Sequence, residues 1–495
     1  MSIQKIQKNL QTIQPQNGGV PINFHVSDEL MPDQKTIKQL INVSHQPNIF
    51  HHLSALSDVH YKKGRKNPSG TVVAVEKHFL PQLIDTAPNC GMRLIKTPFN
   101  SQSLSLEKID ELFKALVKSV PTKAYLGNYL PFQTIVDISR RGSIALLEYF
   151  KKDVGEIENT MNQGNMFEKE IPTKKTLFSA LPKLFFHIGQ FRLGILGAAG
   201  NHFLDLMKVE TILDQTIAEK WGIKQDQYLF MIHTGSGLFG QYASYFFTPK
   251  IKEHFSQQII LKIGQYLFKE KNYSWFKKLK KDLTTYKYQK EFYQIPANSE
   301  LGENYFIAHR AAANHGFANR AMIQINIERT LEKILGKKFT LPLIYDMTHI
   351  SVTEEKYFGK KVFVHRNNTT RAWGPQKMAG TKLYEETGEP VFLPSSMSTP
   401  AYLAAALDNN DSTFSSAPHG TGRSKTATSE VPKNKEALFK KMADRQVRLY
   451  NAQSAGVIQQ DASSYKDVEK ALAGIKENGI ARPVARMMPV AVLMY

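Results

Sequence analysis

Three apolar runs in this chain, each with the composition of a buried strand, reach a histidine beside a polar turn. Tyr228–Ile232 leads to His233 and the glycine-rich turn after it, a second run carries His349, and a third reaches His365. Short apolar runs bounded by glycine and polar residues are typical of strands inside a core. One such histidine is readily explained as a core residue bonded to a backbone carbonyl. Three in matching positions favour strands that bring imidazoles to a metal or phosphate site.

Two further histidines lie in glycine-rich segments. His202 follows the glycine-dense stretch 190–200, and glycine lets a backbone approach a ligand closely. His419 is followed by alternating glycines and Arg423. Backbone N–H groups and a guanidinium can therefore converge there on a phosphate.

The charge balance favours a polyanionic partner. The chain has 64 Lys and Arg against 44 Asp and Glu, a formal net charge of +20, which attracts polyanions through counterion release. A soluble basic enzyme without such a partner is the alternative. Between Lys252 and Lys290, ten lysines and three acids give a net +7, with aromatic residues interleaved. Such a stretch is typical of a surface that binds single-stranded RNA, and an amphipathic helical pair with a solvated basic side explains it equally well.

Cysteine usage and hydropathy bear on the compartment. Cys90 is the only cysteine, which excludes an internal disulfide. No apolar run approaches the about 18 residues of a membrane span, and residues 1–15 lack the apolar segment of a secretory signal. We therefore expect a cytoplasmic monomer with no membrane contact. The turn before Cys90 favours a thiol presented to another group, although a small buried side chain remains the alternative.

The chain shows no internal repeat and no long low-complexity linker, which favours one compact α+β body with central β-sheets surrounded by helices. We expect an N-terminal extension over residues 1–50, a main domain over 51–495 and a basic, aromatic helical insertion at about 250–300. Ser105 is placed to cap a helix that Pro121 ends. Further helices are expected over residues 433–449 and 465–478.

The order of motifs resembles the RtcB family of RNA ligases. That family's pattern runs through D-V-H, a cysteine-containing turn, G-N-H-F, H-x-G-S, D-x-x-H, H-R-x-x-x-T-R-A, S-M-x-T and H-G-A-G-R. The resemblance is specific and extends from about residue 54 to the end. The matching segments of this chain are Asp58–His60, Asn89–Arg93, Leu196–Asp205, His233–Ser236, Asp346–His349, His365–Ala372, Ser396–Thr399, His419–Arg423 and Tyr465–Val468.

The resemblance implies an RtcB-like fold and an enzyme that uses Mn²⁺ and GTP. Such an enzyme joins an RNA 3′-phosphate or 2′,3′-cyclic phosphate end to a 5′-hydroxyl end, in RNA repair or tRNA splicing. A phosphate monoester is a poor electrophile, so transfer of GMP onto it creates the leaving group that joining requires. The need for an archease-like activator stays open. The alternatives are a non-catalytic RNA-binding or damage-sensing relative and a metal-dependent phosphoesterase.

Individual roles follow from the same resemblance. His419 would carry GMP as a phosphoramidate, and a thiolate with three imidazoles, a set suited to borderline divalent metals, would hold two ions. The metal ligands implied are Cys90, His202, His233 and His349. The nucleotide-binding residues implied are Asn201, Asp205, Ser396, Gly420, Thr421, Gly422 and Tyr465, and those for RNA are Arg366, Arg371 and Arg423.

The chain departs from the family at several of these positions. Ala87 stands where the family has a metal-binding aspartate, and we leave open whether Asp85 or Asp58 replaces it. Met494 stands at the position of a C-terminal lysine that contacts the nucleotide. A second metal ion is therefore expected to bind more weakly.

Overall fold

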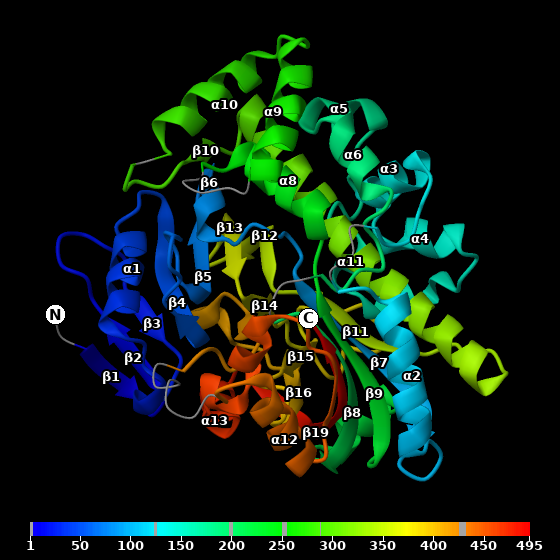
Figure 1. Ribbon diagram of the computed structural model, residues 1–495. Helices are drawn as coiled ribbons and strands as arrows, with labels where there is room; N and C mark the ends of the chain where they lie inside the picture. The colour runs from blue at the N-terminus through cyan, green and yellow to red at the C-terminus, as the bar shows by residue number, and fades with distance from the viewer. Residues whose placement is uncertain (1–2, 123–125, 198–200, 250–254, 288, 425–431) are drawn as a thin grey trace.

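The computed structural model describes residues 3–122, 126–197, 201–249, 255–287, 289–424 and 432–495 (Figure 1). Two large sheets occupy the centre and helices cover them, so the expected α+β class is confirmed. Among these residues, no helix combines the length and apolarity that a bilayer span requires.

The first sheet has seven strands in the order β1-β2-β3-β4-β5-β13-β12. Its first three strands come from residues 3–24, so the segment expected as an N-terminal extension contributes to the same sheet as β4 and β5. The helices α1 and α13 pack on this sheet through buried aliphatic side chains. The bounds are β1 Ile3–Gln7, β2 Leu10–Ile13, β3 Ile22–Phe24, α1 Gln34–Ser44, β4 Ile49–His60, β5 Ser69–Val75, β12 Ile350–Tyr357, β13 Lys360–Asn367 and α13 Val468–Glu477.

The second sheet has eight strands, ordered β11-β7-β9-β8-β19-β16-β15, with β18 paired to β19. Because β7 is antiparallel to both β9 and β11, and β8 is antiparallel to β9, the starts of β7 and β8 share an edge with the ends of β9 and β11. Gly91 accordingly pairs with both Thr234 and Thr348. The bounds are β7 Gly91–Asn100, β8 Phe203–Ile212, β9 Gln227–Thr234, β11 Leu343–Thr348, β15 Pro390–Leu393, β16 Ala401–Ala406, β18 Arg448–Asn451 and β19 Ala481–Met494.

One long helix, α11 (Glu300–Leu335), runs beside the edge where these strand ends meet (Figure 1). Ser299 caps it by accepting a hydrogen bond from the Gly302 N–H, and Gly336, at φ 71°, ends it. Most of its residues are buried, as expected for a helix enclosed on several sides. The two small sheets are β14 (Thr369–Arg371) with β17 (Ser416–Pro418) and β6 (His78–Phe79) with β10 (Ile295–Pro296).

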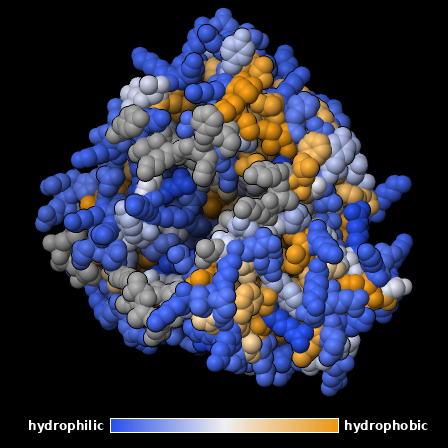
Figure 2. Space-filling view, viewed as in Figure 1, coloured by the Kyte–Doolittle hydropathy of each residue, from blue (hydrophilic) through white to orange (hydrophobic). Residues whose placement is uncertain are grey.

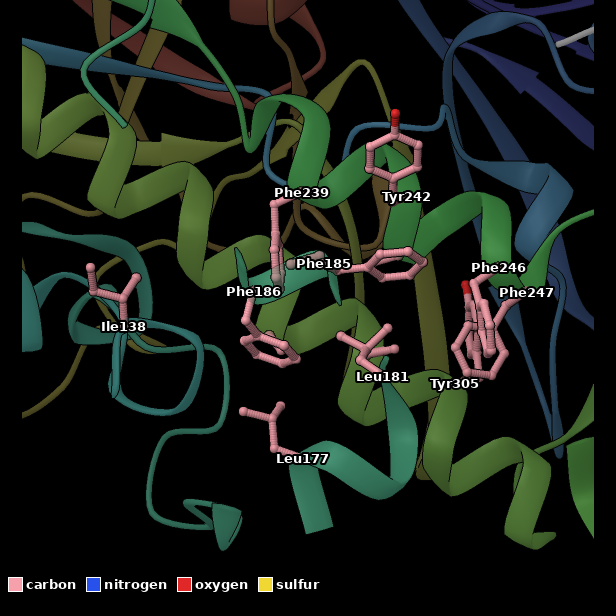
Figure 3. Close-up of a cluster of buried hydrophobic side chains, with 14 of the residues drawn as sticks. Ile138, Leu177, Leu181, Phe185, Phe186, Phe239, Tyr242, Phe246, Phe247 and Tyr305 are labelled. Carbon is pink, nitrogen blue, oxygen red and sulfur yellow. The ribbon is translucent and has the colours of Figure 1, made fainter. Parts of the chain in front are cut away.

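An aromatic cluster joins several shorter helices to one another and to α11 (Figure 3). Phe185 stacks on Tyr242, and Phe186 packs edge-on against Phe239. Phe246 extends the cluster by stacking on Phe276 of α10, at 5.5 Å between ring centroids. Rings of this kind bury large areas and fix helix positions. The helix bounds are α2 Leu106–Ser119, α3 Phe132–Arg141, α4 Ser143–Tyr149, α5 Lys174–Ala180, α6 Lys183–Gly189, α7 Gln215–Trp221, α8 Gly237–Phe247, α9 Phe255–Lys269, α10 Ser274–Thr285 and α12 Lys435–Asp444.

The helices expected after Ser105 and over 465–478 correspond to α2 and α13, whereas the one expected over 433–449 is shorter than predicted. The Ser105 side chain accepts a hydrogen bond from the Lys108 N–H at 3.3 Å, which confirms the expected cap of α2. The helix expected over 433–449 stops at Asp444 instead. Gln446 has a left-handed φ of 59°, and the residues after it form β18, parallel to β19. The prediction of one helix there was wrong because a parallel strand partner is invisible to local periodicity.

Candidate active site

The ligand residues expected from sequence come together at the strand ends. Cys90 precedes β7, His202 precedes β8, His233 lies near the end of β9, and His349 follows β11. Since these four ends share one edge of the sheet, side chains that are far apart in sequence become neighbours. His365 does not join them, because it lies within β13 and its Nε2 accepts a hydrogen bond from the Leu80 N–H at 3.2 Å. His365 is therefore a core histidine, which is the other explanation that the sequence allows for one histidine of this kind.

The four side chains form a continuous chain of contacts that runs through His233. Cys90 Sγ is 3.3 Å from His202 Nε2 and 3.5 Å from His233 Nε2. His233 Nε2 is in turn 3.0 Å from His349 Nε2. Ligand atoms of Cys90, His202 and His233 form one group able to hold a metal ion, and those of His233, His349 and His419 form a second. His233 belongs to both groups.

A hydrogen bond behind the His202 ring sets which of its nitrogens faces the centre. His202 Nδ1 lies 2.8 Å from the Leu196 carbonyl oxygen and donates to it, so its Nε2 lone pair points at the thiol. Burial lowers the pKa of His202 to about 4 and holds the pKa of His349 well below its usual range, so both imidazoles are neutral at pH 7. Burial also raises the pKa of the Cys90 thiol to about 12. The donor set thus suits a divalent ion, whose binding would displace the thiol proton.

Cys90 itself is buried, with 6% of its surface exposed. The structure therefore agrees with the alternative of a small buried side chain, although the buried thiol lies against the His202 and His233 rings. Asn89, at φ 54°, makes the turn that starts β7. Arg320 of α11 fixes this turn, since its guanidinium donates to the Asn89 carbonyl at 3.1 Å and to the Thr234 carbonyl at 2.8 Å.

His419 enters from the loop after β17 and stacks on His349, with ring centroids 4.1 Å apart. Its Nδ1 lies 2.9 Å from the Asn368 carbonyl oxygen and 3.3 Å from the Asp58 carboxylate. Nδ1 is therefore the protonated nitrogen, and Nε2 keeps its lone pair. Asp58 is buried, which by itself would raise its pKa, but His419 and His60 hold that pKa well below the usual range.

The two acids considered as replacements for the aspartate at position 87 are both engaged elsewhere. Asp58 contacts His419, His60 and the Ser69 hydroxyl. Asp85 is paired with Lys62 and Arg65, and it lies in neither group of converging ligand atoms found among the described residues. Lys62, which pairs with Asp85, belongs to none of the motifs. Its position in a basic loop is the only sequence feature that could have pointed to this role.

A cavity of about 440 Å³ opens beside the cluster. Figure 2 shows the hollowed, largely hydrophilic face on which it opens. His233 and His419 reach this cavity from the cluster, and Met494 lines it as well. It is lined by every residue expected to bind the nucleotide, namely Asn201, Asp205, Ser396, Gly420, Thr421, Gly422 and Tyr465.

Asp205 and Asp58 are both acids on the cavity wall. Among the described residues, the buried Oδ1 of Asp205 has no hydrogen-bond partner, and burial raises the pKa of Asp205 well above the usual range. An unsatisfied buried oxygen that lines a cavity is available to a ligand's donor. Across the cavity, the Arg423 guanidinium lies over the Tyr465 ring at 4.6 Å.

The two other arginines expected at RNA are buried in ion pairs. Arg366 bonds Glu355 at 3.1 Å, and Arg371 bonds Glu389 at 2.8 Å. Arg371 also covers the Trp373 ring. Their contact with RNA phosphates stays a prediction. In the structure, the ion pairs hold the side chains of β13 and β14 in place next to the segment that carries His419.

Comparison with known proteins places this chain among the RNA ligases. The family model described as tRNA-splicing ligase RtcB matches residues 39–494. The chain therefore belongs to the RtcB family, as its motifs predicted.

Relatives of full length support the same assignment. The chain is 29% identical to the tRNA-splicing ligase RtcB of Thermococcus kodakarensis, over 96% of this chain and 94% of that protein. It is 28% identical to that of Nanoarchaeum equitans, over 100% and 99%. The RtcB of Methanococcus maripaludis is 29% identical, over 96% and 95%. The similarity thus covers both sheets and the site between them.

Proposed function

We propose that the protein joins RNA 3′-phosphate or 2′,3′-cyclic phosphate ends to 5′-hydroxyl ends, using GTP and Mn²⁺, in RNA repair or tRNA splicing. The observation that carries this proposal is the placement of His419. Its ring stacks on a cluster ligand, while its free Nε2 belongs to a side chain that lines the nucleotide-sized cavity. A nucleophile, a metal-binding donor set and a phosphate-binding loop thus share one site.

The cluster would hold Mn²⁺ through the Cys90 thiolate and the Nε2 atoms of His202, His233 and His349. Bound there, the ions would supply positive charge to offset the charge on transferring phosphoryl oxygens. Because Asp85 is held by Lys62 and Ala87 offers no ligand, the second ion would have fewer donors than the first.

His419 acts as the nucleophile in this scheme. Its Nε2 attacks the α-phosphorus of GTP, an N–P bond forms, and the bond to the β-phosphate oxygen breaks with loss of pyrophosphate. Asp58 and the Asn368 carbonyl hold Nδ1–H, which stabilises the positive charge that develops on the ring. An oxygen of the RNA 3′-phosphate then attacks the same phosphorus and releases His419. Finally the 5′-hydroxyl attacks the activated 3′-phosphate, and GMP leaves.

The cavity walls would orient the nucleotide and the RNA end. The Asp205 carboxyl, whose Oδ1 has no partner among the described residues, would accept hydrogen bonds from the guanine edge, and the Tyr465 ring would pack against the base. Asn201, Ser396 and the backbone of 420–422 would contact the phosphates, because they line the same wall as His419. Arg423 would then meet the incoming RNA phosphate.

Incubation with α-labelled GTP and Mn²⁺ tests the first step. We expect acid-labile label on the protein and its complete loss in His419→Ala. His187→Ala, which removes an exposed histidine outside the cavity, is the matched control and should label normally. RNA binding without label would instead support a non-catalytic relative.

A second measurement tests the joining reaction. RNA with 3′-phosphate and 5′-hydroxyl ends should be joined only when GTP and Mn²⁺ are present. RNA with 3′-hydroxyl and 5′-phosphate ends should stay unjoined. Release of inorganic phosphate without label on the protein would contradict ligation and favour a phosphoesterase.

A further inference from the structure

The helices α9 and α10 repeat one surface pattern. Each carries a tyrosine and two lysines at spacings of four and three residues, which places all three on one helix face. The residues are Lys262, Tyr266 and Lys269 on α9, and Tyr273, Lys277 and Lys280 on or next to α10.

Five of these six side chains face outward, because the opposite face of the pair is anchored, whereas Tyr273 is half-buried against Phe268 and Trp275. Phe268, Phe276 and Leu279 are buried, and Phe276 stacks on Phe246 of α8. By contrast, Tyr266 is 63% exposed and the four lysines of the pattern are exposed. A large ring held in solvent on a fixed helix is available to stack on a ligand.

The charge on this face is largely uncompensated. Over residues 255–285 there are seven lysines, no arginine and two acids, so seven minus two gives +5. One acid, Asp282, pairs with Lys278. Within the described part of the chain, Lys269, Lys277 and Lys280 form no ion pair.

A depression of about 350 Å³ lies between the end of α9 and the start of α10. Its walls alternate cationic, polar and aromatic groups, which is the chemistry that accommodates a phosphate next to a base. The lining residues are Lys269, Asn272, Tyr273, Phe276, Lys277 and Lys280.

We propose that this face, the α9–α10 surface, binds single-stranded RNA, with lysines at the phosphates and the exposed Tyr266 ring under a base. The proposal deepens the proposed function, because it identifies where RNA flanking the reactive ends would be held. Figure 1 places the two helices on the same side of the molecule as α8, above the central sheets. The lysine pattern favours RNA over a protein partner, which the nearby exposed Ile259 and Ile263 would otherwise suit.

Fluorescence anisotropy with a labelled single-stranded RNA of about 12 nucleotides tests the proposal. Lys277→Ala with Lys280→Ala should weaken binding roughly tenfold or more at moderate salt. Loss of two phosphate contacts should also lower the slope of log affinity against log salt by about 1.4, since each contact contributes about 0.7 for single strands. Lys333→Ala with Lys338→Ala removes the same charge at the far end of α11 and is the matched control. Equal binding by the two double variants would overturn the proposal.

Two variants at Tyr266 separate the contribution of ring stacking to RNA affinity from the contribution of charge. Tyr266→Ala should weaken binding at least about fivefold, while Tyr266→Phe, which keeps the ring, should bind as the unchanged protein does. Loss of affinity in both variants would contradict stacking. GTP labelling of His419 should be unchanged in all α9–α10 variants. If no variant labels but the binding differences persist, the proposed chemistry fails and the RNA surface stands.

Discussion

The cysteine–histidine cluster and the α9–α10 surface are built in opposite ways. The cluster draws on residues from 90 to 419, is largely buried, and presents neutral imidazoles. The α9–α10 surface comes from one contiguous stretch, is exposed, and carries lysines. Chemistry at a phosphorus atom needs donors fixed to within fractions of an ångström, whereas capture of a flexible strand needs only charge and rings. The first demands support from the whole fold, and the second does not.

Support for the cluster comes from buried ions. Asp346 of β11 lies between two buried arginines, at 2.9 Å from Arg93 Nη1 and 2.7 Å from Arg320 Nη2. Arg320 also holds the backbone on both sides of the sheet edge that carries Cys90 and His233. Among the residues that the structure describes, no buried carboxylate between two arginines lies under α9 and α10, whose inner face is aromatic and aliphatic.

The largest effect is expected at Arg320. Arg320→Leu leaves the Asp346 charge buried with one partner fewer and should cost about 3–5 kcal/mol in the free energy of unfolding. Arg329→Leu, on the exposed side of the same helix, should change it by less than about 1 kcal/mol. Urea unfolding monitored by circular dichroism measures both. If the two variants had the same free energy of unfolding, the buried ions would not be the support that the cysteine–histidine cluster depends on.

Acid should destabilise the buried region through Glu355. Although burial alone would raise its pKa, Arg366 holds the pKa of Glu355 at about 2. A carboxyl whose folded pKa is depressed stabilises the protein above its unfolded pKa of about 4.3 and loses that contribution as pH falls toward 2. The contribution is about 3 kcal/mol. Unfolding experiments between pH 6 and 2 should show a flatter profile for Glu355→Gln, and an unchanged profile would contradict this assignment.

Removal of the thiol should weaken metal binding while leaving the fold intact. Cys90→Ala is expected to lower Mn²⁺ affinity about 100-fold, the upper end of what loss of a supporting group costs. Calorimetric titration measures the affinity, and Co²⁺ absorption reports the sulfur–metal bond directly. The same substitution should leave RNA affinity of the α9–α10 surface unchanged. A normal Co²⁺ spectrum in the variant would exclude Cys90 as a ligand.

The smallest stability effect is expected on the α9–α10 surface. Lys269→Ala removes an exposed side chain without an ion pair in the described part of the chain, so the free energy of unfolding should change by less than about 0.5 kcal/mol. Thermal unfolding beside the unchanged protein checks this. A cost above about 1 kcal/mol would show that the lysine has a structural role.

The sequence predicts local structure better than it predicts how the elements are arranged in space. The cap of α2 and the strands before His233 and His349 follow from spacing alone. The convergence of four strand ends does not, because it depends on the pairing of β7 with partners more than a hundred residues away. His365 shows what local sequence cannot decide. Its local pattern matches that of His233, but it lies in the other sheet and is a core residue. Arg320 carried no signal within a long alanine-rich helix.

The position of β19 has a practical consequence. This strand lies between β8 and β16 although it comes from residues 481–494. The second sheet therefore cannot be completed before those residues have been synthesised. Met494 ends the strand inside the cavity wall. An affinity tag fused directly after residue 495 would therefore begin beside the nucleotide cavity, whereas one placed before residue 3 would extend from an outer strand of the other sheet. Recombinant protein for nucleotide studies should carry its tag on the N-terminal side.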